Sequence, residues 1–138
     1  MTAFYDLDRA NARLGEVRPL LETLQRQRLQ LIELRERAVS VHEASGAPER
    51  ESGGSADEQA RHLELRIQAL VDQMQAGVAR LDEWSIQLRD IEAGLIDFPA
   101  LVAGRQVWLC WRLGEERVAW WHELGTGFGG RRRLEDLA

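Results

Sequence analysis

Lysine is absent from this chain of 138 residues, so all 18 of its positive charges are arginines. Codon usage in a GC-rich genome is the simplest cause, and planar, bidentate recognition of carboxylate or phosphate is the functional alternative. Acidic residues outnumber the arginines and give a formal net charge of −5. Nucleic-acid binding depends on a basic face that neutralises phosphates. We therefore do not expect DNA or RNA as a partner.

Cysteine and long apolar runs are also scarce. The single cysteine, Cys110, excludes an intrachain disulfide and favours a reducing compartment. The first residues lack the basic and apolar regions of a secretion signal. No window approaches the roughly 18 uninterrupted apolar residues of a membrane-spanning helix. The sequence thus predicts a cytoplasmic protein that does not bind membranes.

Two long segments repeat apolar residues at intervals of three and four, which is the spacing of one helix face. The first predicts a short helix over 7–14, an interruption at Gly15 and a longer helix over 16–43. The second predicts a helix from about Asp57 to Trp84. Residues 44–56, which are small, polar and rich in glycine, are typical of a flexible linker. Residues 7–84 are therefore expected to form an antiparallel helical hairpin.

After Trp84 the apolar residues alternate with polar ones, as they do in strands. Short strands are expected near 86–88, at 95–98, at 106–113 and at 117–122, with a hairpin turn at 114–116. The β region would cover 85–124, and 125–138 would be a C-terminal loop. The predicted fold class is α+β: one domain, 1–138, in which the helical hairpin packs on an antiparallel sheet of about four strands.

Strand alternation divides the last hairpin into two faces. One predicted face, interpreted as core, contains Val107, Leu109, Trp111, Leu113, Val118, Trp120 and His122. The other contains Trp108, Cys110, Arg112, Arg117, Ala119 and Trp121. Cys110 and His122 would then lie on opposite faces unless a bulge intervenes.

Several segments of the C-terminal third form a specific pattern. They are Gly-Leu-Ile-Asp-Phe-Pro-Ala at 94–100, Gly104-Arg105, Val-Trp-Leu-Cys-Trp-Arg-Leu-Gly-Glu at 107–115, Trp121-His122, Gly127-Phe128 and Gly130-Arg131. With Ala10-Asn11-Ala12 and residues 18–21 (Arg-Pro-Leu-Leu) near the start, this pattern resembles a bacterial family known only as domain of unknown function 2203. Gly15 and Ser85 depart from it, since proline and glycine are usual there. The resemblance implies no activity.

The candidate metal ligands are Asp97, Cys110, Glu115 and His122. Carboxylate, thiolate and imidazole are ligands of transition metals, and three of them would leave a coordination position open for catalysis. No pair has a diagnostic spacing, however, so a buried cysteine and a hydrogen-bonded histidine are the structural alternative. Nucleophilic catalysis by Cys110 with His122 is a weaker hypothesis, because no residue evidently orients the imidazole.

A second ligand set combines His42 with Glu58 and His62 at the mouth of the helical hairpin. Their positions on polar helix faces favour solvated histidines instead. In the β region, Asp97 and Arg105 suggest an ion pair with a structural role.

Residues 125–130 match G-x-G-x-x-G but have no strand–helix context, so they cannot form a dinucleotide-binding unit. A flexible loop is favoured, with an anion-binding nest as the alternative. Candidate anion-binding residues are Arg105, Arg112 and Arg131.

Four tryptophans, at 108, 111, 120 and 121, lie within fourteen residues, and one face of a small sheet cannot bury all of them. Trp108 and Trp121 are therefore predicted to form an interaction surface. The leading hypothesis is a small binding module, with a homodimer, another protein or a small anionic ligand as partner. The rival is a metal-binding protein or metalloenzyme, with a transition metal as cofactor, and the third is an anion- or nucleotide-binding protein. No reaction or substrate is indicated.

Overall fold

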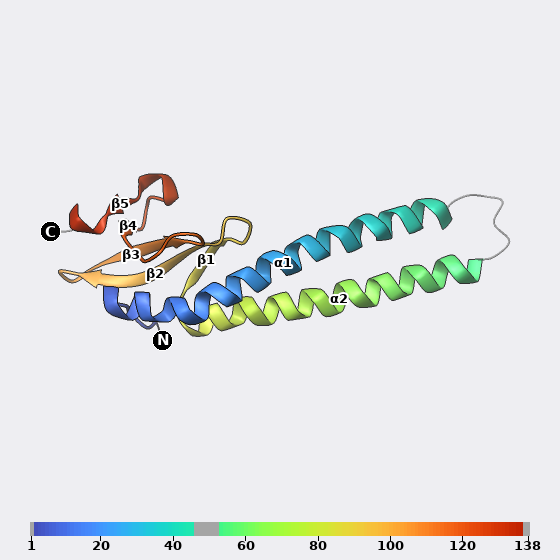
Figure 1. The fold of residues 1–138 in the computed structure, drawn as a ribbon, viewed down its shortest axis with the longest axis horizontal. Helices are drawn as coiled ribbons and strands as arrows, with labels where there is room; N and C mark the ends of the chain where they lie inside the picture. Colours follow the sequence, from blue (N-terminus) through green and yellow to red (C-terminus); the bar gives the residue numbers. More distant parts are fainter. Residues whose placement is uncertain (1, 46–52, 137–138) are drawn as a thin grey trace. The chain divides into compact units, whose positions relative to one another are not determined.

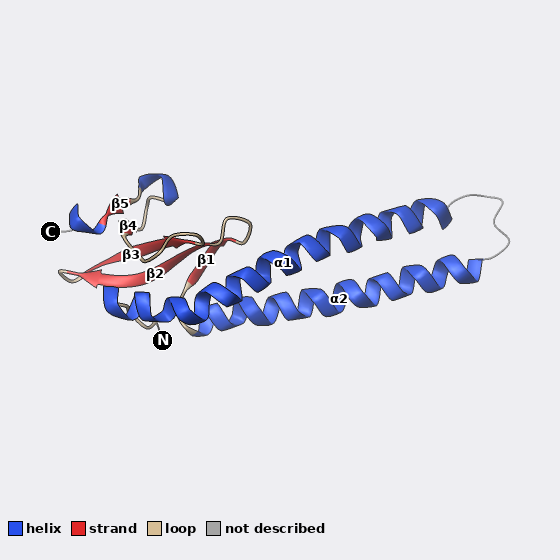
Figure 2. Cartoon of the chain, in the orientation of Figure 1, coloured by secondary structure: helices blue, strands red, loops and turns tan. Residues whose placement is uncertain are grey.

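The computed structural model describes residues 2–45 and 53–136. These residues form two long helices and a five-stranded antiparallel sheet, which confirms the predicted α+β class (Figures 1 and 2). Contacts divide the chain into two compact units. The sheet unit comprises Met1–Gln25 and Gly77–Ala138, and the helical unit comprises Arg26–Ala76. The single-domain organisation stays a prediction.

Helix α1 covers Leu7–Ser45 and begins after Asp6, whose carboxylate accepts a 2.8 Å hydrogen bond from the backbone N–H of Arg9. The expected interruption at Gly15 is wrong, because the helix is continuous through it. Glycine costs about 1 kcal/mol relative to alanine within a helix. Burial of Leu14 and Val17 on either side outweighs that cost.

Helix α2 covers Gly53–Glu83, so it begins four residues before the predicted start. Of the predicted linker, Ala44 and Ser45 belong to α1 and 53–56 belong to α2. Residues 46–52 lie outside the described residues.

Within the helical unit, the two helix segments run antiparallel (Figure 2). Leu34 of α1 and Leu63 and Leu70 of α2 form its buried core. The partly buried residues packed around them are Leu31, Ala38, Val41, Ile67 and Met74. These side chains come from the three-and-four stripes of the sequence, so the helical hairpin is confirmed here.

The sheet has the order β1-β2-β3-β4-β5, and each strand is antiparallel to its neighbours. The strands are β1 (Gln87–Asp90), β2 (Leu95–Val102), β3 (Arg105–Arg112), β4 (Trp120–His122) and β5 (Arg132–Arg133). The fifth strand lies in the predicted C-terminal loop, which also contains two short 3-10 helices, Phe128–Gly130 and Leu134–Asp136. A strand of two residues is too short to show alternation.

One face of the sheet forms the core of the sheet unit. Ile96, Phe98 and Ala100 of β2 lie opposite Trp111, Leu109 and Val107 of β3, and all six are buried. The ring of Tyr5 packs edge-on against Phe98, and the guanidinium of Arg18 in α1 lies over Trp111. The start of α1 therefore covers this face.

The register of β3 and β4 corrects the predicted face assignment. Trp108 pairs with His122, Leu109 with Trp121 and Cys110 with Trp120. An odd number of residues, 111–119, separates the last pair, so odd-numbered residues of both strands share one face and even-numbered residues the other. The prediction combined odd with even numbers and was wrong by one residue. Cys110 and His122 consequently lie on the same face.

Candidate metal centre

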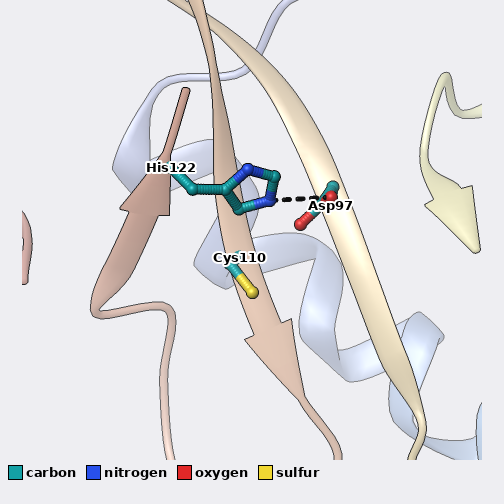
Figure 3. A group of neighbouring side chains, drawn as sticks. All are labelled: Asp97, Cys110 and His122. Atoms are coloured by element: carbon teal, nitrogen blue, oxygen red, sulfur yellow. Dashed lines mark hydrogen bonds and ion pairs between the residues drawn. The ribbon is translucent and has the colours of Figure 1, made fainter. Parts of the chain in front are cut away.

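Three ligand-type side chains meet on the sheet face opposite the core (Figure 3). Asp97 on β2 lies directly opposite Cys110 on β3. His122 on β4 pairs with Trp108, which precedes Cys110 by two residues on β3 and therefore lies on the same face. One carboxylate oxygen, the thiol sulfur and one ring nitrogen all lie within 4.8 Å of one another. Each residue is at most 3% exposed. We call these three residues the Asp–Cys–His cluster.

The hydrogen bonds of His122 fix the position of a proton. Its Nδ1 lies 2.9 Å from the backbone carbonyl of Glu123, and a carbonyl only accepts, so Nδ1 carries a hydrogen. Its Nε2 lies 2.9 Å from Oδ2 of Asp97. A hydrogen bond at that distance requires one proton between the ring and the carboxylate. The pair therefore holds one proton, which a metal ion would displace.

The two carboxylate oxygens of Asp97 have different surroundings. Oδ2 accepts a 2.8 Å hydrogen bond from Nε of Arg89 in addition to the contact with His122. Oδ1 is buried and has no hydrogen-bond partner among the residues that the structure describes. An unpaired buried carboxylate oxygen is costly, which favours a ligand at Oδ1. The predicted pair of Asp97 with Arg105 is not formed.

The thiol of Cys110 is a neutral group at physiological pH. Burial is the main cause that raises its pKa to about 12, and the nearby charge of Asp97 acts in the same direction. Arg131, whose Nη1 lies 4.0 Å from the sulfur, lowers this pKa by a smaller amount. Both ring nitrogens of His122 are bonded elsewhere, so the imidazole does not activate the thiol, and the carboxylate of Asp97 raises the pKa of Cys110 instead of lowering it. The geometry therefore disfavours nucleophilic catalysis by Cys110.

A pocket of about 350 Å³ opens beside the Asp–Cys–His cluster. Its walls are Arg89 and Leu95 on the sheet and residues 124–128, in which the sequence is Leu-Gly-Thr-Gly-Phe. The glycine-rich segment thus lines a pocket next to ligand-type side chains.

Glu115 does not join the cluster. Its carboxylate forms a two-point ion pair with Arg131, with distances of 2.5 and 3.3 Å, and accepts a 2.8 Å hydrogen bond from the backbone N–H of Arg112. His42, Glu58 and His62 are exposed, and they form no three-residue ligand group among the described residues. Across residues 2–45 and 53–136, the Asp–Cys–His cluster is the single group of three or more potential metal ligands.

Two of the three candidate anion-binding arginines lie at one aromatic ring. Arg112 and Arg131 both lie over the ring of Phe128, and Arg131 is also paired with Glu115. Arg105 instead forms an exposed 3.3 Å ion pair with Glu123.

The two tryptophans of the predicted interaction surface also differ. Trp121 is 3% exposed and lies on the core face, whereas Trp108 is half-buried beneath the guanidinium of Arg89.

Sequence reasoning missed Arg89. The pairing of β1 with β2 is irregular between Leu88 and Asp90, so Arg89 lies at the irregularity. Bulges re-aim side chains, and alternation alone gives no signal for them. The carbonyl of Glu123 was missed as well, because a backbone acceptor has no residue signature.

Comparison with known proteins adds a family but no activity. The family model described as "Uncharacterized conserved protein (DUF2203)" matches residues 3–134. Neither the curated proteins nor the solved structures give a match.

Proposed function

This chain belongs to the uncharacterised conserved family DUF2203, and we propose that it binds a transition metal through Asp97, Cys110 and His122. The observation that carries the proposal is the buried convergence of carboxylate, thiol and imidazole, with Oδ1 of Asp97 unpaired in the described chain. Buried polar groups are normally satisfied, so such an atom beside two further ligand types favours an ion.

The groups around the cluster support the same function. Histidines that bind metals usually donate their other ring N–H to a carbonyl or carboxylate, and Nδ1 of His122 donates to the carbonyl of Glu123. Arg89 holds Oδ2 of Asp97 and leaves Oδ1 for the ion. Metal binding would displace the thiol proton of Cys110 and the proton of the His122–Asp97 pair.

The ligand types also limit the metal and its use. One sulfur, one nitrogen and one oxygen ligand suit Zn²⁺ and its first-row neighbours better than Mg²⁺ or Ca²⁺, which prefer oxygen. Structural zinc sites usually have four protein ligands, whereas catalytic sites have three and an open position. The three residues beside a pocket fit the second class.

Metal analysis of untagged protein prepared without chelators tests the proposal. We expect about one equivalent of transition metal, and Co²⁺ loading should give a thiolate-to-metal charge-transfer band. Cys110→Ala should lose the band. His122→Gln should weaken Co²⁺ binding at least tenfold, because loss of a residue that only orients a ligand already costs about 10- to 100-fold in metal affinity. His62→Ala, which removes an exposed histidine of α2, is the matched control and should bind normally.

Two results would contradict the proposal. One is folded wild-type protein that takes up no Zn²⁺ or Co²⁺ in solution. The other is stoichiometric metal that Cys110→Ala and His122→Gln both retain with unchanged affinity and spectrum.

The interaction module is the second candidate function, and one observation bears on it. Each of the five tryptophans has an arginine guanidinium within 5.6 Å of its ring centroid. These stacks already occupy much of the aromatic surface within the chain. The accessible part of Trp108 remains for a partner or second copy. Sedimentation of the wild type and Trp108→Ala tests the second copy, since self-association through Trp108 predicts a dimer that the variant weakens.

A further inference from the structure

We infer that the pocket beside the Asp–Cys–His cluster takes a small monocarboxylate whose head group bridges the metal and Arg89. This inference rests on the proposed metal site and names the ligand class of that site. It follows from the charge of the pocket, the donors of Arg89 and the apolar walls.

The charge balance favours an anion. A divalent ion is neutralised by the carboxylate of Asp97 and the thiolate of Cys110, while His122 contributes no charge as a ligand. Arg89 then leaves the pocket positively charged, because Arg131 is paired with Glu115 and Arg112, which lies over the Phe128 wall, adds a further positive charge nearby. A monoanion offsets the charge of Arg89.

Arg89 has donors for such an anion. Its Nε donates to Asp97, and its terminal nitrogens donate to no other residue among those described. Its side chain is 40% exposed and lines the pocket. Because Arg89 binds the same carboxylate that would ligate the metal and lines the same pocket, its fork would lie close to the bound ion. A planar carboxylate matches that fork.

The remaining walls of the pocket indicate what the rest of the ligand, beyond its carboxylate, consists of. Leu95, Leu124 and Phe128 line the pocket, and Leu124 and Phe128 are 56% and 38% exposed. Exposed apolar side chains at the edge of a pocket indicate an apolar ligand part. A volume of about 350 Å³ is at the small end of ligand pockets. These features together fit a carboxylate with a short apolar tail.

Titration of Co²⁺-loaded protein in a buffer free of carboxylates tests the inference. Butyrate should shift the visible spectrum of the bound Co²⁺ saturably, and the uncharged analogue butyramide should not. Acetate, propionate and butyrate should bind about fourfold tighter for each added methylene. Phe128→Ala should flatten that dependence on chain length.

Variants of Arg89 test whether its guanidinium binds the carboxylate together with the metal. Arg89→Gln should weaken butyrate at least tenfold, and Arg89→Lys should weaken it less, since it keeps the charge and loses the fork. Arg105→Gln alters an exposed pair and is the matched control. Each variant is first shown to bind one Co²⁺ with the wild-type charge-transfer band.

The outcomes separate this inference from the proposed function. Failure to bind Co²⁺ overturns both. If Co²⁺ binds normally and butyrate leaves its spectrum unchanged, the carboxylate proposal is overturned and the proposed metal site stands. Equal butyrate affinity in Arg89→Gln and the wild type overturns the role of Arg89, and tighter binding of inorganic phosphate than butyrate overturns the carboxylate class.

Discussion

At the scale of single residues, the carboxylate of Asp97 links two side chains, Arg89 and His122. Oδ2 contacts both Arg89 and His122, and the side chain of Asp97 is 2% exposed. Removal of one partner from a buried pair leaves the other unpaired and typically costs about 3–5 kcal/mol, and the lower end applies here because the side chain of Arg89 is 40% exposed. The structural importance of Asp97 is therefore separate from any metal.

Asp97→Ala should lower the free energy of unfolding of the metal-free protein by about 3 kcal/mol, because Arg89 and the buried His122 lose their acceptor. Urea unfolding in the presence of a chelator measures the change. Glu123→Ala, which removes an exposed ion pair with Arg105, is the control and should change stability by less than about 1 kcal/mol. Equal effects of the two variants would contradict the buried pairing.

The thiol of Cys110 predicts a loss of stability in alkali. Its pKa is raised from 9.0 to about 12 in the folded protein, mainly by burial. The unfolded chain therefore releases this proton first, and the stabilisation declines as the pH rises from about 9 to about 12. Between pH 7.5 and pH 10.5, the free energy of unfolding should fall by up to about 2 kcal/mol more in the wild type than in Cys110→Ala.

Urea titrations of both chelated proteins at the two pH values measure this difference. The absence of lysine keeps the background of other alkaline titrations small. Parallel pH dependence in the two proteins would show that the thiol ionises as easily in the folded state as in the unfolded one.

At the scale of elements, two glycines test the packing of the helices. A Cβ added at Gly15 would meet nothing within 4 Å, whereas one at Gly77 would lie 3.1 Å from Cδ2 of Leu24. Alanine is favoured over glycine within a helix by about 1 kcal/mol. Gly15→Ala should gain most of that amount, and Gly77→Ala should gain less or lose stability. Thermal or urea unfolding compares them, and a larger gain at Gly77 would contradict the packing of α2 against Leu24.

The same scale shows which elements the sequence could predict. Long helices repeat their apolar spacing many times, so both helices and the class of fold were predictable. Gly15 lowers helix stability only locally, and the burial of the neighbouring Leu14 and Val17 stabilises the helix by more than this cost, so the helix continues. Strand β5 has two residues and no period. Local signals therefore fail where an element is short or where tertiary packing overrides propensity.

The candidate site was predictable in its residue types and not in its geometry. Asp97, Cys110 and His122 were chosen because their side chains are metal ligands. Their convergence depends on the parity of the β3–β4 register, and one residue of error placed Cys110 and His122 on opposite faces. Glu115 had the right chemistry, but its pairing with Arg131 depends on where the C-terminal segment lies. Long-range register and loop placement have no counterpart in local sequence.

At the scale of the whole molecule, the proposed ligands belong to one unit. Asp97, Cys110 and His122 are all in the sheet unit, and the helical unit, Arg26–Ala76, contributes none of them. A ligand stabilises the state that binds it, by about 2.7 kcal/mol at a free concentration of 100 times its dissociation constant. That stabilisation should therefore act on the sheet unit.

Hydrogen exchange with and without Zn²⁺ tests the two-unit organisation together with the metal site. At a free Zn²⁺ concentration of about 100 times its dissociation constant, hydrogen exchange of β2 and β3 amides that exchange through unfolding of the sheet unit should slow about 100-fold. Amides of the helical unit that exchange through local opening should keep their rates, because no ligand lies among them. His122→Gln should abolish the slowing at the same Zn²⁺ concentration. Equal slowing in both units would instead show that the chain opens as one cooperative body, so that metal bound to the sheet also stabilises the helical unit.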